Sequence, residues 1–308
     1  MHSASVIICS HNPRPEYLRR TLESLRVQTL DAGRWELIVV DNRSEPPLDG
    51  RIDLEWSPDA RIVREEQLGL THARLAGIRI SQGDVLVFVD DDNVLAPDFL
   101  ETALRVAEEK PFLGSWSGQC KPEFESTPPE WTRRYWGNLV IREFDTDTWS
   151  NLPRLPDSMP CGAGLCVRRS VAMQYLHLHE SGERDVVLDR TGDSLLSGGD
   201  NDLAACACDI GLGVGLISSL HLTHLIPPER LTTDYIERLV EGIYTSSAIL
   251  DWQRGGNRAG SSMPRRAIDF ARALAAGEPH RRILLAAQRG RQAGLDRIKA
   301  LSSRKIDA

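Results

Sequence analysis

The sequence lacks an apolar run long enough to cross a bilayer, which takes roughly 20 residues. It also lacks, at its start, the charged and then apolar leader of a secreted chain. These two absences predict a soluble, cytoplasmic protein. With 308 residues, 41% of them hydrophobic, the chain can bury a substantial core in one large domain, alone or with a smaller appendage.

The cysteines never form the paired CxxC spacing of a zinc knuckle. Most of them have apolar neighbours, so we expect buried, reduced thiols rather than zinc ligands or disulfides. There are six: Cys9, Cys120, Cys161, Cys166, Cys206 and Cys208.

The net charge of −7 is unevenly distributed. Residues 255–308 carry 12 Lys and Arg against 4 Asp and Glu, a net +8, which leaves −15 on the preceding 254 residues. A basic helical tail on an acidic body can indicate contact with anionic lipid or an acidic polymer. A solvated helical face is the interpretation that we favour, because charge runs usually face water.

Apolar runs and amphipathic segments alternate along the first 110 residues. The predicted strands are Val6–Cys9, Trp35–Val40, the weaker Ile62–Val63, and Val85–Val89. The predicted helices are Pro15–Val27, Leu70–Ile80 and Pro97–Glu109. This alternation is typical of a doubly wound, mostly parallel α/β sheet, in which ligands bind beyond the carboxyl ends of the strands. Three of the strands end in polar or acidic side chains, so we expect these side chains to converge on one edge.

The second half is less regular. Residues 120–160 are rich in proline and aromatic residues and predict a loop-rich insertion. Further apolar or helical segments follow: Gly164–Val167, Val171–His177, Ser197–Ile210, Ile217–Leu225, Asp234–Gln253, Arg265–Ala276 and Arg281–Ser302, with a linker at 255–262. We predict a catalytic domain over 1–228, with a donor-binding half (1–119) and an acceptor-side half (120–228), and a helical appendage over 229–308.

Asp90, Asp91 and Asp92 follow directly on the predicted Val85–Val89 strand. Three adjacent carboxylates repel one another unless a cation neutralises them. Oxygen ligands with open positions suit Mg²⁺ or Mn²⁺ bound together with substrate phosphates. An acidic loop in water is the alternative, and the position after a buried strand favours the metal.

Four segments together resemble the family 2 glycosyltransferases of the GT-A fold. They are Val6–Asn12 (VIICSHN), Ile38–Ser44 (IVVDNRS), Gly69-Leu70 with Ala73-Arg74, and Val87–Asn93 (VFVDDDN) with Pro97-Asp98 and Leu100. Their order and spacing both agree with the family, over roughly residues 3–225. Each motif is weak alone, and the set is specific.

The resemblance implies a role for each matched residue. Cys9 and His11 occupy the loop that holds the nucleobase, with His11 where the family usually has a tyrosine. Asp41 matches the carboxylate that accepts a hydrogen bond from the base, most often uracil, and Arg74 matches a basic contact to the nucleotide. The DxD motif falls on Asp90 and Asp92. Asp91 then lies near the ribose or sugar, and Asp92 is the direct ligand of the metal.

The resemblance also implies a general base. The family carries a Glu-Asp pair before an apolar helix, and its Asp takes the proton of the acceptor hydroxyl; Asp200 matches that Asp, and Gly199 stands in the place of the Glu. Asp202 is the rival base. A helix N-cap is the structural alternative for either Asp, and Asp202 is our candidate for it.

His224 matches a histidine that completes the metal shell in many GT-A enzymes, with His221 as the alternative. The turn Cys161–Gly164 resembles one that lets the backbone approach the donor, and Arg168 or Arg169 is a candidate contact to the diphosphate. Three aromatic side chains could form a platform for the acceptor sugar or else belong to the core: Trp131, Tyr135 and Trp136.

Together these observations predict an inverting, Mn²⁺- or Mg²⁺-dependent glycosyltransferase that uses a nucleotide-sugar donor, in first place a UDP-sugar. A carbohydrate or glycolipid of surface polysaccharide assembly is the expected acceptor. We expect no nucleic-acid partner, and peripheral contact with the inner face of the membrane through the basic C-terminal helices is an open option. A silent nucleotide-sugar-binding protein is the first alternative. A nucleotidyltransferase is disfavoured, because Ser10–Arg14 is no glycine-rich, lysine-bearing phosphate loop.

Overall fold

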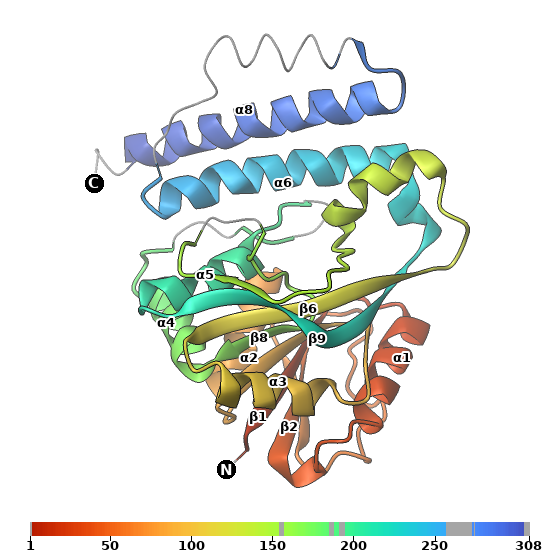
Figure 1. Ribbon diagram of the computed structural model, residues 1–308, viewed down its shortest axis with the longest axis vertical. Helices are drawn as coiled ribbons and strands as arrows, with labels where there is room; N and C mark the ends of the chain where they lie inside the picture. Colours follow the sequence, from red (N-terminus) through yellow and green to blue (C-terminus); the bar gives the residue numbers. More distant parts are fainter. Residues whose placement is uncertain are drawn as a thin grey trace. The chain divides into compact units, whose positions relative to one another are not determined.

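The computed structural model describes residues 2–153, 157–184, 188–190, 195–256, 273 and 275–304. Its centre is a nine-stranded mixed sheet in the order β3-β2-β1-β4-β8-β6-β9-β5, with β7 also paired to β9 (Figure 1). The strands are β1 (Ala4–Ser10), β2 (Trp35–Asp41), β3 (Ala60–Arg64), β4 (Val85–Asp90), β5 (Asn93–Leu95), β6 (Leu113–Phe124), β7 (Thr148–Ser150), β8 (Leu165–Arg168) and β9 (Gly213–Ile226).

Helices connect β1 to β2 and β3 to β4, as the alternating pattern predicts, whereas a loop over residues 42–59 connects β2 to its parallel neighbour β3. The α-helices are α1 (Pro15–Arg26), α2 (Leu70–Ile80), α3 (Phe99–Glu109), α4 (Arg169–Glu180), α5 (Gly199–Asp209), α6 (Thr233–Gln253) and α8 (His280–Arg304). Short 3-10 helices are η1 (Ala32–Arg34), η2 (Glu130–Leu139) and η3 (Pro228–Leu231). Pro15 opens α1, where its missing N–H costs no hydrogen bond.

The strand registers bring the predicted polar ends together. Strand β1 pairs in parallel with β2 and β4, and Cys9 lies between Val40 and Asp90 while Ser10 lies opposite Asp41. The carboxyl ends of parallel strands share one edge of a sheet, so the motif residues after β1, β2 and β4 gather there. This confirms the predicted mostly parallel α/β architecture.

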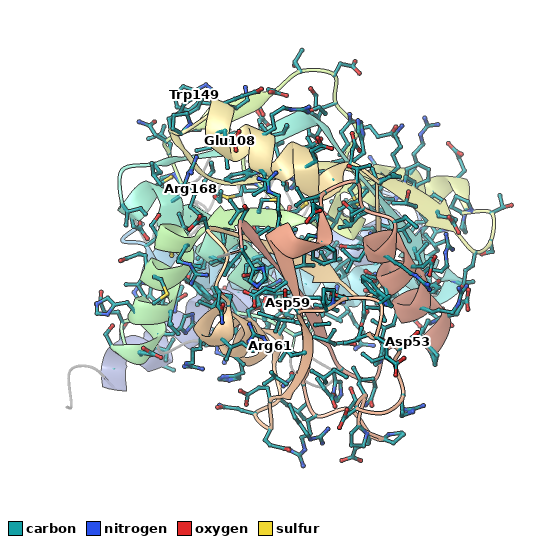
Figure 2. All side chains as sticks on the ribbon, turned by 90° about the horizontal axis from the view of Figure 1, so that it is seen from below. Asp53, Asp59, Arg61, Glu108, Trp149 and Arg168 are labelled. Atoms are coloured by element: carbon teal, nitrogen blue, oxygen red, sulfur yellow. The ribbon has the colours of Figure 1, made fainter. Side chains whose placement is uncertain are left out.

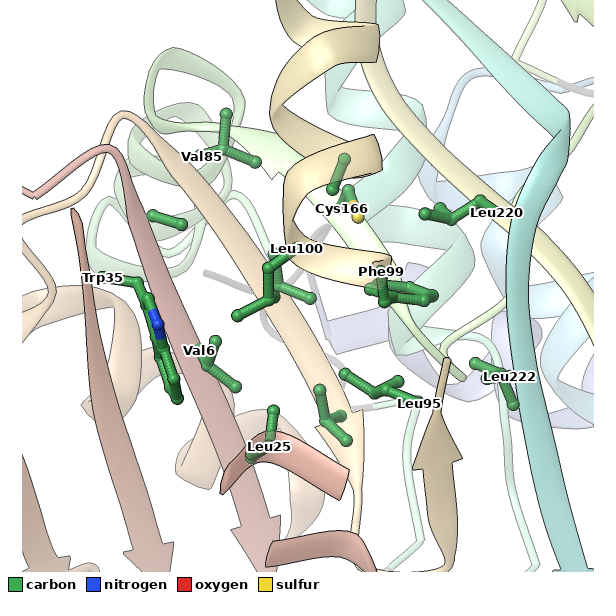
Figure 3. Packing of buried hydrophobic residues seen from close by; sticks show 14 of the residues in the cluster. Val6, Leu25, Trp35, Val85, Leu95, Phe99, Leu100, Cys166, Leu220 and Leu222 are labelled. Carbon is green, nitrogen blue, oxygen red and sulfur yellow. The ribbon is translucent and has the colours of Figure 1, made fainter. Parts of the chain in front are cut away.

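Two apolar clusters cover the two faces of this sheet because successive strand residues point to opposite sides. Val6 and Ile8 of β1 face the cluster that contains α1 and α3, and Ile7 faces the cluster that contains α2, α4 and α5. Figure 3 shows Leu25 of α1 and Leu100 of α3 packed over Val6. Burial on both faces explains why the predicted strands are almost uninterrupted apolar runs.

The sequence underestimates two long strands. β6 occupies Leu113–Phe124 and so includes the start of the predicted loop-rich region, and β9 begins at Gly213, four residues before the apolar segment Ile217–Leu225. These two strands pair in parallel, and β5 pairs antiparallel to β9 so that Asn93 lies opposite His224. The short strand β5 therefore ties the acidic triplet to the end of β9.

The chain divides into two compact units: the first is Met1–Glu125, Leu139–Asp185 and Gly199–Ile226, and the second is Ser126–Asn138, Val186–Gly198 and Pro227–Ala308. The first contains the sheet. In the second, α6 and α8 run side by side and parallel, because Arg282 meets Asp234 near their starts and Gly294 meets Thr245 further along (Figure 1). The predicted linker at 255–262 and most of the predicted helix Arg265–Ala276 lie outside the described residues. The division at residue 228 into catalytic domain and appendage stays a prediction.

None of the helices in the described part of the chain is long and apolar enough to span a membrane. Two arginines of the basic helix α8 form ion pairs with acidic side chains of α6. Arg282 pairs with Asp234 and Glu237, and Arg289 pairs with Glu237 and Glu241. These arginine side chains are nevertheless about half exposed, so the ion pairs are solvated and individually weak.

Candidate active site

The acidic triplet follows β4 and meets the end of β9. Asp92 is buried, and its Oδ2 lies 3.4 Å from Nε2 of the buried His224. Asn93 supports this arrangement, because its side chain donates to Asp92 Oδ1 at 3.0 Å and accepts from the Asp90 amide at 3.2 Å. The backbone adds a bond from the Leu225 amide to the Asp92 carbonyl at 2.9 Å. The structure therefore brings together the two side chains predicted as metal ligands.

The strand geometry distinguishes the two candidate histidines. His224 faces Asp92, and His221 lies three residues earlier in a regular stretch of β9. Because side chains alternate along a strand, residues three apart point to opposite faces. His221 therefore points away from the acidic triplet, and of the two only His224 is placed to share an ion with Asp92.

The Asp92 and His224 pair has the chemistry of a partial metal site. Ligand bonds of about 2.1 Å place neighbouring donors of one ion about 3 Å or more apart, which agrees with their separation. In the part of the chain that is described, no group of three or more His, Cys, Asp or Glu forms a complete metal cluster. The pair thus fits an ion such as Mn²⁺ or Mg²⁺ that takes its other ligands from phosphate and water.

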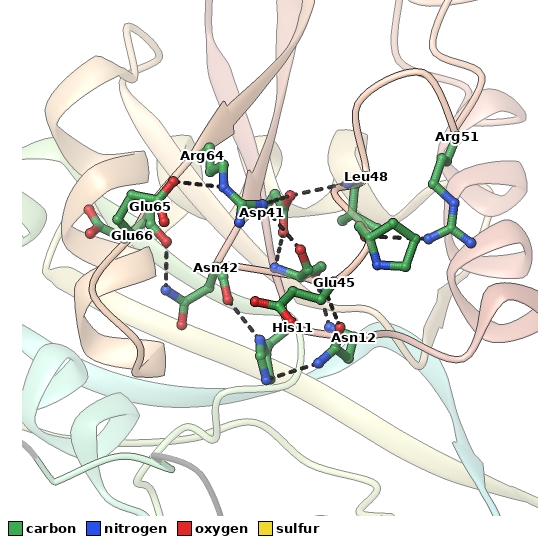
Figure 4. Close-up of polar contacts among 12 residues, drawn as sticks. His11, Asn12, Asp41, Asn42, Glu45, Leu48, Arg51, Arg64, Glu65 and Glu66 are labelled. Carbon is green, nitrogen blue, oxygen red and sulfur yellow. Dashed lines mark hydrogen bonds and ion pairs between the residues drawn. The ribbon is translucent and has the colours of Figure 1, made fainter.

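Asp41 organises the loop that follows β2 (Figure 4). Its carboxylate is 1% exposed and accepts hydrogen bonds from the amides of Ser44 (2.8 Å) and Leu48 (3.1 Å) and from Arg64 Nη1 (2.9 Å). Burial alone would raise the pKa of Asp41, but the bonds from Ser44 and Leu48 and the charge of Arg64 outweigh burial and lower it. Asp41 is therefore ionised and held firmly inside its own loop.

The predicted nucleobase loop has its polar side chains arranged by their neighbours. Nδ1 of His11 lies 2.8 Å from the Asn42 carbonyl, which can only accept, so Nδ1 carries the proton. Nε2 then accepts from the Asn12 side chain at 3.2 Å. Ser10 donates to Asp91 Oδ2 at 2.5 Å and so links this loop to the acidic triplet.

Asp200, Arg74 and Gly162 lie close together and form a third group of site residues. Asp200 Oδ2 accepts a hydrogen bond from the Gly162 amide at 2.7 Å. A Cβ atom on Gly162 would lie 3.0 Å from Asp200 Oδ2 and 3.2 Å from Arg74 Nη2, so both groups crowd the same side of this glycine. The turn that contains Gly162 thereby anchors one oxygen of the predicted base.

The pKa values of two buried thiols are raised in part by carboxylates of the site. Burial is the main cause that raises the pKa of Cys161, and the charges of Asp200 and Asp90 add to the rise. The pKa of Cys120 is also raised, first by burial, with contributions from Asp92 and Asp90. The charge of Asp90 thus contributes to the raised pKa of both thiols. Within the described residues none of the six cysteines forms a disulfide; four are buried, and Cys9 and Cys208 are partly exposed.

Comparison with known proteins identifies the family. Residues 5–175, more than half of the chain, match the family described as Glycosyl transferase family 2. This chain belongs to glycosyl transferase family 2. The resemblance read from the motifs is confirmed.

Relatives within the family are similar over the N-terminal part. The chain is 28% identical over 130 residues to a glucosyl-dolichyl phosphate glucuronosyltransferase of Haloferax volcanii, 41% of each chain. It is 34% identical over 108 residues to an uncharacterized glycosyltransferase of Haemophilus influenzae, 35% of each chain. It therefore spans well under half the length of these two relatives. An N-acetylglucosaminyltransferase of Bradyrhizobium elkanii is 34% identical over 121 residues, 38% of this chain and 65% of the relative.

Solved structures share the fold over nearly the whole chain. S. aureus TarS 1–349 in complex with UDP-GlcNAc superposes with a TM-score of 0.54 at 14% identity, covering 96% of this chain and 89% of TarS. The mannosyltransferase PcManGT from Pyrobaculum calidifontis, in complex with GDP-Man and Mn²⁺, gives 0.57 at 16% identity, covering 95% and 87%. At such identities the likeness shows the fold, and it confirms the predicted GT-A class.

Asp202 differs from the family base in its surroundings. Helix α5 begins at Gly199, so Asp202 lies inside its first turn, and our assignment of Asp202 as the N-cap is wrong. Its carboxylate is 3% exposed and accepts from Arg184 Nε at 2.9 Å. This buried ion pair gives Asp202 a structural partner that the sequence did not reveal.

The candidate contact of Arg168 or Arg169 to the diphosphate is also wrong. Arg168 lies opposite Val85, the first residue of β4, at the end of the strand remote from the acidic triplet. It donates to the carbonyls of Leu113 and Ala107, both at 2.6 Å, and Arg169 donates to the Gly83 carbonyl at 2.6 Å. Figure 2 accordingly shows Arg168 near Glu108, at the end of α3. Strand β8 runs antiparallel to β4, so the last residue of β8 lies at the edge of the sheet opposite to the one that carries the acidic triplet.

Of the aromatic candidates, two pack within the second unit. Trp131 and Tyr135 lie against a cluster built from α6 and α8, and their ring centroids are 6.2 Å apart. Tyr135 also shares a hydrogen bond of 2.9 Å with His280 Nδ1. These contacts favour the core alternative over an acceptor platform for this pair.

Sequence reasoning missed several residues that shape the site. Arg64 and Ser10 contact predicted site residues directly, and Asn42 ties the β2 loop to Gly69 at the start of α2 through a bond of 2.8 Å. The signal for Arg64 was its place at the end of a predicted strand beside β2. Leu139 contributes its backbone carbonyl, which lies 3.0 Å from His224 Nδ1. A backbone group gives no signal in the sequence, because every residue has one.

Proposed function

We propose that this chain is an inverting glycosyltransferase that moves a sugar from a nucleotide-sugar donor to an acceptor hydroxyl. The carrying observation is that a chain of this family holds Asp92, His224 and Asp200 at one edge of its sheet, with an anchored Asp200 oxygen. Nucleotide sugars bound by TarS and PcManGT support the class of donor. A UDP-sugar is our first choice of donor.

The donor would lie across the ends of β1, β2 and β4. Cys9, His11 and Asp41 would surround the base, and Arg74 would contact the nucleotide. Because Asp41 is already bonded to its own loop, its part in base recognition includes holding that loop in shape. Asp90 and Asp91 would meet the ribose and sugar, and the Ser10 hydroxyl fixes the orientation of Asp91.

A divalent ion, Mn²⁺ or Mg²⁺, would be held by Asp92 and His224. When bound, it supplies positive charge that stabilises the departing diphosphate. The Mn²⁺ in the PcManGT complex supports this assignment, as does the 3.4 Å separation of the two side chains. The protein would supply two ligands, and the donor phosphates would supply others.

Asp200 would act as the general base. Its Oδ2 is held by the Gly162 amide, and the other oxygen makes no hydrogen bond within the described residues, which leaves it able to accept a proton. The acceptor hydroxyl then attacks the anomeric carbon from the face opposite the diphosphate as its proton passes to Asp200. A single displacement of this kind inverts the configuration.

The acceptor is proposed more broadly as a carbohydrate or glycolipid. Peripheral membrane contact through α8 belongs to the same proposal, and the pairing of Arg282 and Arg289 with α6 limits the charge that α8 offers to anionic lipid. The second candidate function is a silent nucleotide-sugar-binding protein. Gly199 in place of the family Glu is the observation that favours it.

The test is the substitution Asp200→Asn, measured with a panel of sugar nucleotides in Mn²⁺. We expect donor hydrolysis or transfer to fall by at least about 100-fold, because a base is lost, with donor binding by calorimetry nearly unchanged. Asp202→Asn is the matched control. It should lower the free energy of unfolding, since Arg184 loses its charged partner, and it should leave the transfer rate per folded molecule unchanged. An unchanged rate in Asp200→Asn would remove this residue from the mechanism, and no turnover by the wild type with any donor would favour the silent binder.

A further inference from the structure

The ring of His224 is held from the side opposite Asp92. Its Nδ1 lies 3.0 Å from the carbonyl oxygen of Leu139, while Nε2 is the nitrogen that faces Asp92. A carbonyl oxygen only accepts hydrogen bonds, so Nδ1 carries a proton. The Leu139 carbonyl therefore fixes both the orientation of the imidazole and which nitrogen faces the acidic triplet.

The next residue has an unusual backbone. Val140 has a φ of +63°, in the left-handed region that β-branched residues strongly avoid. Such a conformation persists only where the surrounding structure determines it. The direction of the Leu139 carbonyl depends directly on the peptide unit that joins these two residues.

The contacts on either side of Val140 explain how the strain is held. Leu139 is 4% exposed, and Arg142, two residues after Val140, forms an antiparallel bridge with Cys120, with bonds of 2.9 and 3.0 Å. Cys120 belongs to β6, which pairs with β9 two positions before His224. The turn is thus fastened to the same strands that carry the histidine.

We propose that Leu139 and Val140 are positioning residues of the metal centre: the left-handed backbone of Val140 aims the Leu139 carbonyl at His224 and presents Nε2 to the ion. This inference rests on the proposed metal role of His224. It assigns a function to a strained turn that lies 84 residues from His224 in the sequence.

The first test needs no substitution in the turn. In ¹⁵N-labelled, metal-free protein, the His224 signals, assigned by their loss in His224→Gln, should show a protonated Nδ1. Because an imidazolium carries a proton on both nitrogens, the signals must be read at a pH where one nitrogen of His224 has a lone pair. A neutral imidazole side chain in water prefers the proton on Nε2, so a proton on Nδ1 at that pH reports the Leu139 bond. A lone pair on Nδ1 would overturn the inference whatever the enzyme does.

The second test measures Mn²⁺ binding by electron paramagnetic resonance in the presence of UDP. Val140→Gly can keep the left-handed conformation and should keep the Mn²⁺ affinity, whereas Val140→Pro cannot adopt it and should bind Mn²⁺ about 10- to 100-fold more weakly. Unchanged affinity in folded Val140→Pro would overturn the inference, provided that His224→Gln lowers the affinity. If His224→Gln binds Mn²⁺ as the wild type does, the metal role of His224 itself fails. Should Val140→Pro not fold, the Nδ1 measurement decides.

Discussion

At the scale of single residues, Asp41 combines nearly complete burial with ionisation. Its Oδ1 accepts from Ser44 and its Oδ2 accepts from Leu48 and Arg64. Asparagine keeps one oxygen that can accept from Ser44, but its NH2 group replaces Oδ2 and leaves the Leu48 amide and the Arg64 guanidinium without their acceptor. We expect Asp41→Asn to lower the free energy of unfolding by about 3 kcal/mol at pH 7, measured by urea denaturation. The exposed Asp49→Asn, with a change below about 0.5 kcal/mol, is the matched control.

The effect of Asp41→Asn depends on pH in a definite direction. The pKa of Asp41 is lowered in the folded protein from its ordinary value of 3.8, so the stability that its charge adds is complete above that value. It is lost as the pH falls through the lower, folded-state pKa. The difference between wild type and Asp41→Asn should therefore shrink towards zero in strong acid, and a constant difference would contradict the assigned cause.

At the scale of elements, the close contact of α6 and α8 depends on glycine. A Cβ on Gly290 would lie 2.2 Å from the Glu241 carbonyl oxygen, so the helices would have to separate. We expect Gly290→Ala to lower the free energy of unfolding by about 1–3 kcal/mol, although alanine is the better helix former. Gly277→Ala is the control, because nothing lies within 4 Å of its Cβ position. A stabilising Gly290→Ala in thermal unfolding would show that the helices do not pack this closely.

The elements also show which parts of the fold the sequence predicts. Strands β1, β2 and β4 are buried on both faces and are therefore evident as apolar runs. Strands β6 and β9 contain glycine and serine, which read as turns. Gly118 of β6 is in fact a contact glycine, since its Cβ would lie 2.0 Å from the Leu220 carbonyl oxygen. The requirement for glycine at this position becomes evident only when the neighbouring strand β9 is in place.

The candidate site also has one part that the sequence predicts and another that it does not. The resemblance located Asp92, His224 and Asp200 because motif side chains carry a recognisable signal, and the structure brings Asp92 and His224 together. The Gly162 amide and the Leu139 carbonyl could not be found, because a backbone group has the same chemistry at every residue. The error with Arg168 has a topological cause: the direction of β8 in the sheet is not encoded in its four residues.

At the scale of the whole molecule, ion and nucleotide should bind together. In the proposed function Asp92 and His224 would supply two ligands and the donor phosphates the others, so the protein alone should hold Mn²⁺ weakly. Linkage then requires that Mn²⁺ raise the affinity for UDP by the same factor by which UDP raises the affinity for Mn²⁺.

This linkage predicts a synergistic rise in melting temperature. A nucleotide at about 100 times its dissociation constant adds about 2.7 kcal/mol of stability, or roughly 5 °C for a protein of this size. UDP with Mn²⁺ should give that rise, and UDP with a chelator, or Mn²⁺ alone, should give much less. Asp92→Asn should keep the small effect of UDP alone and lose the synergy, since one of the two proposed protein ligands is gone. An equal rise from UDP with and without Mn²⁺ would mean that nucleotide binding does not depend on an ion at Asp92 and His224.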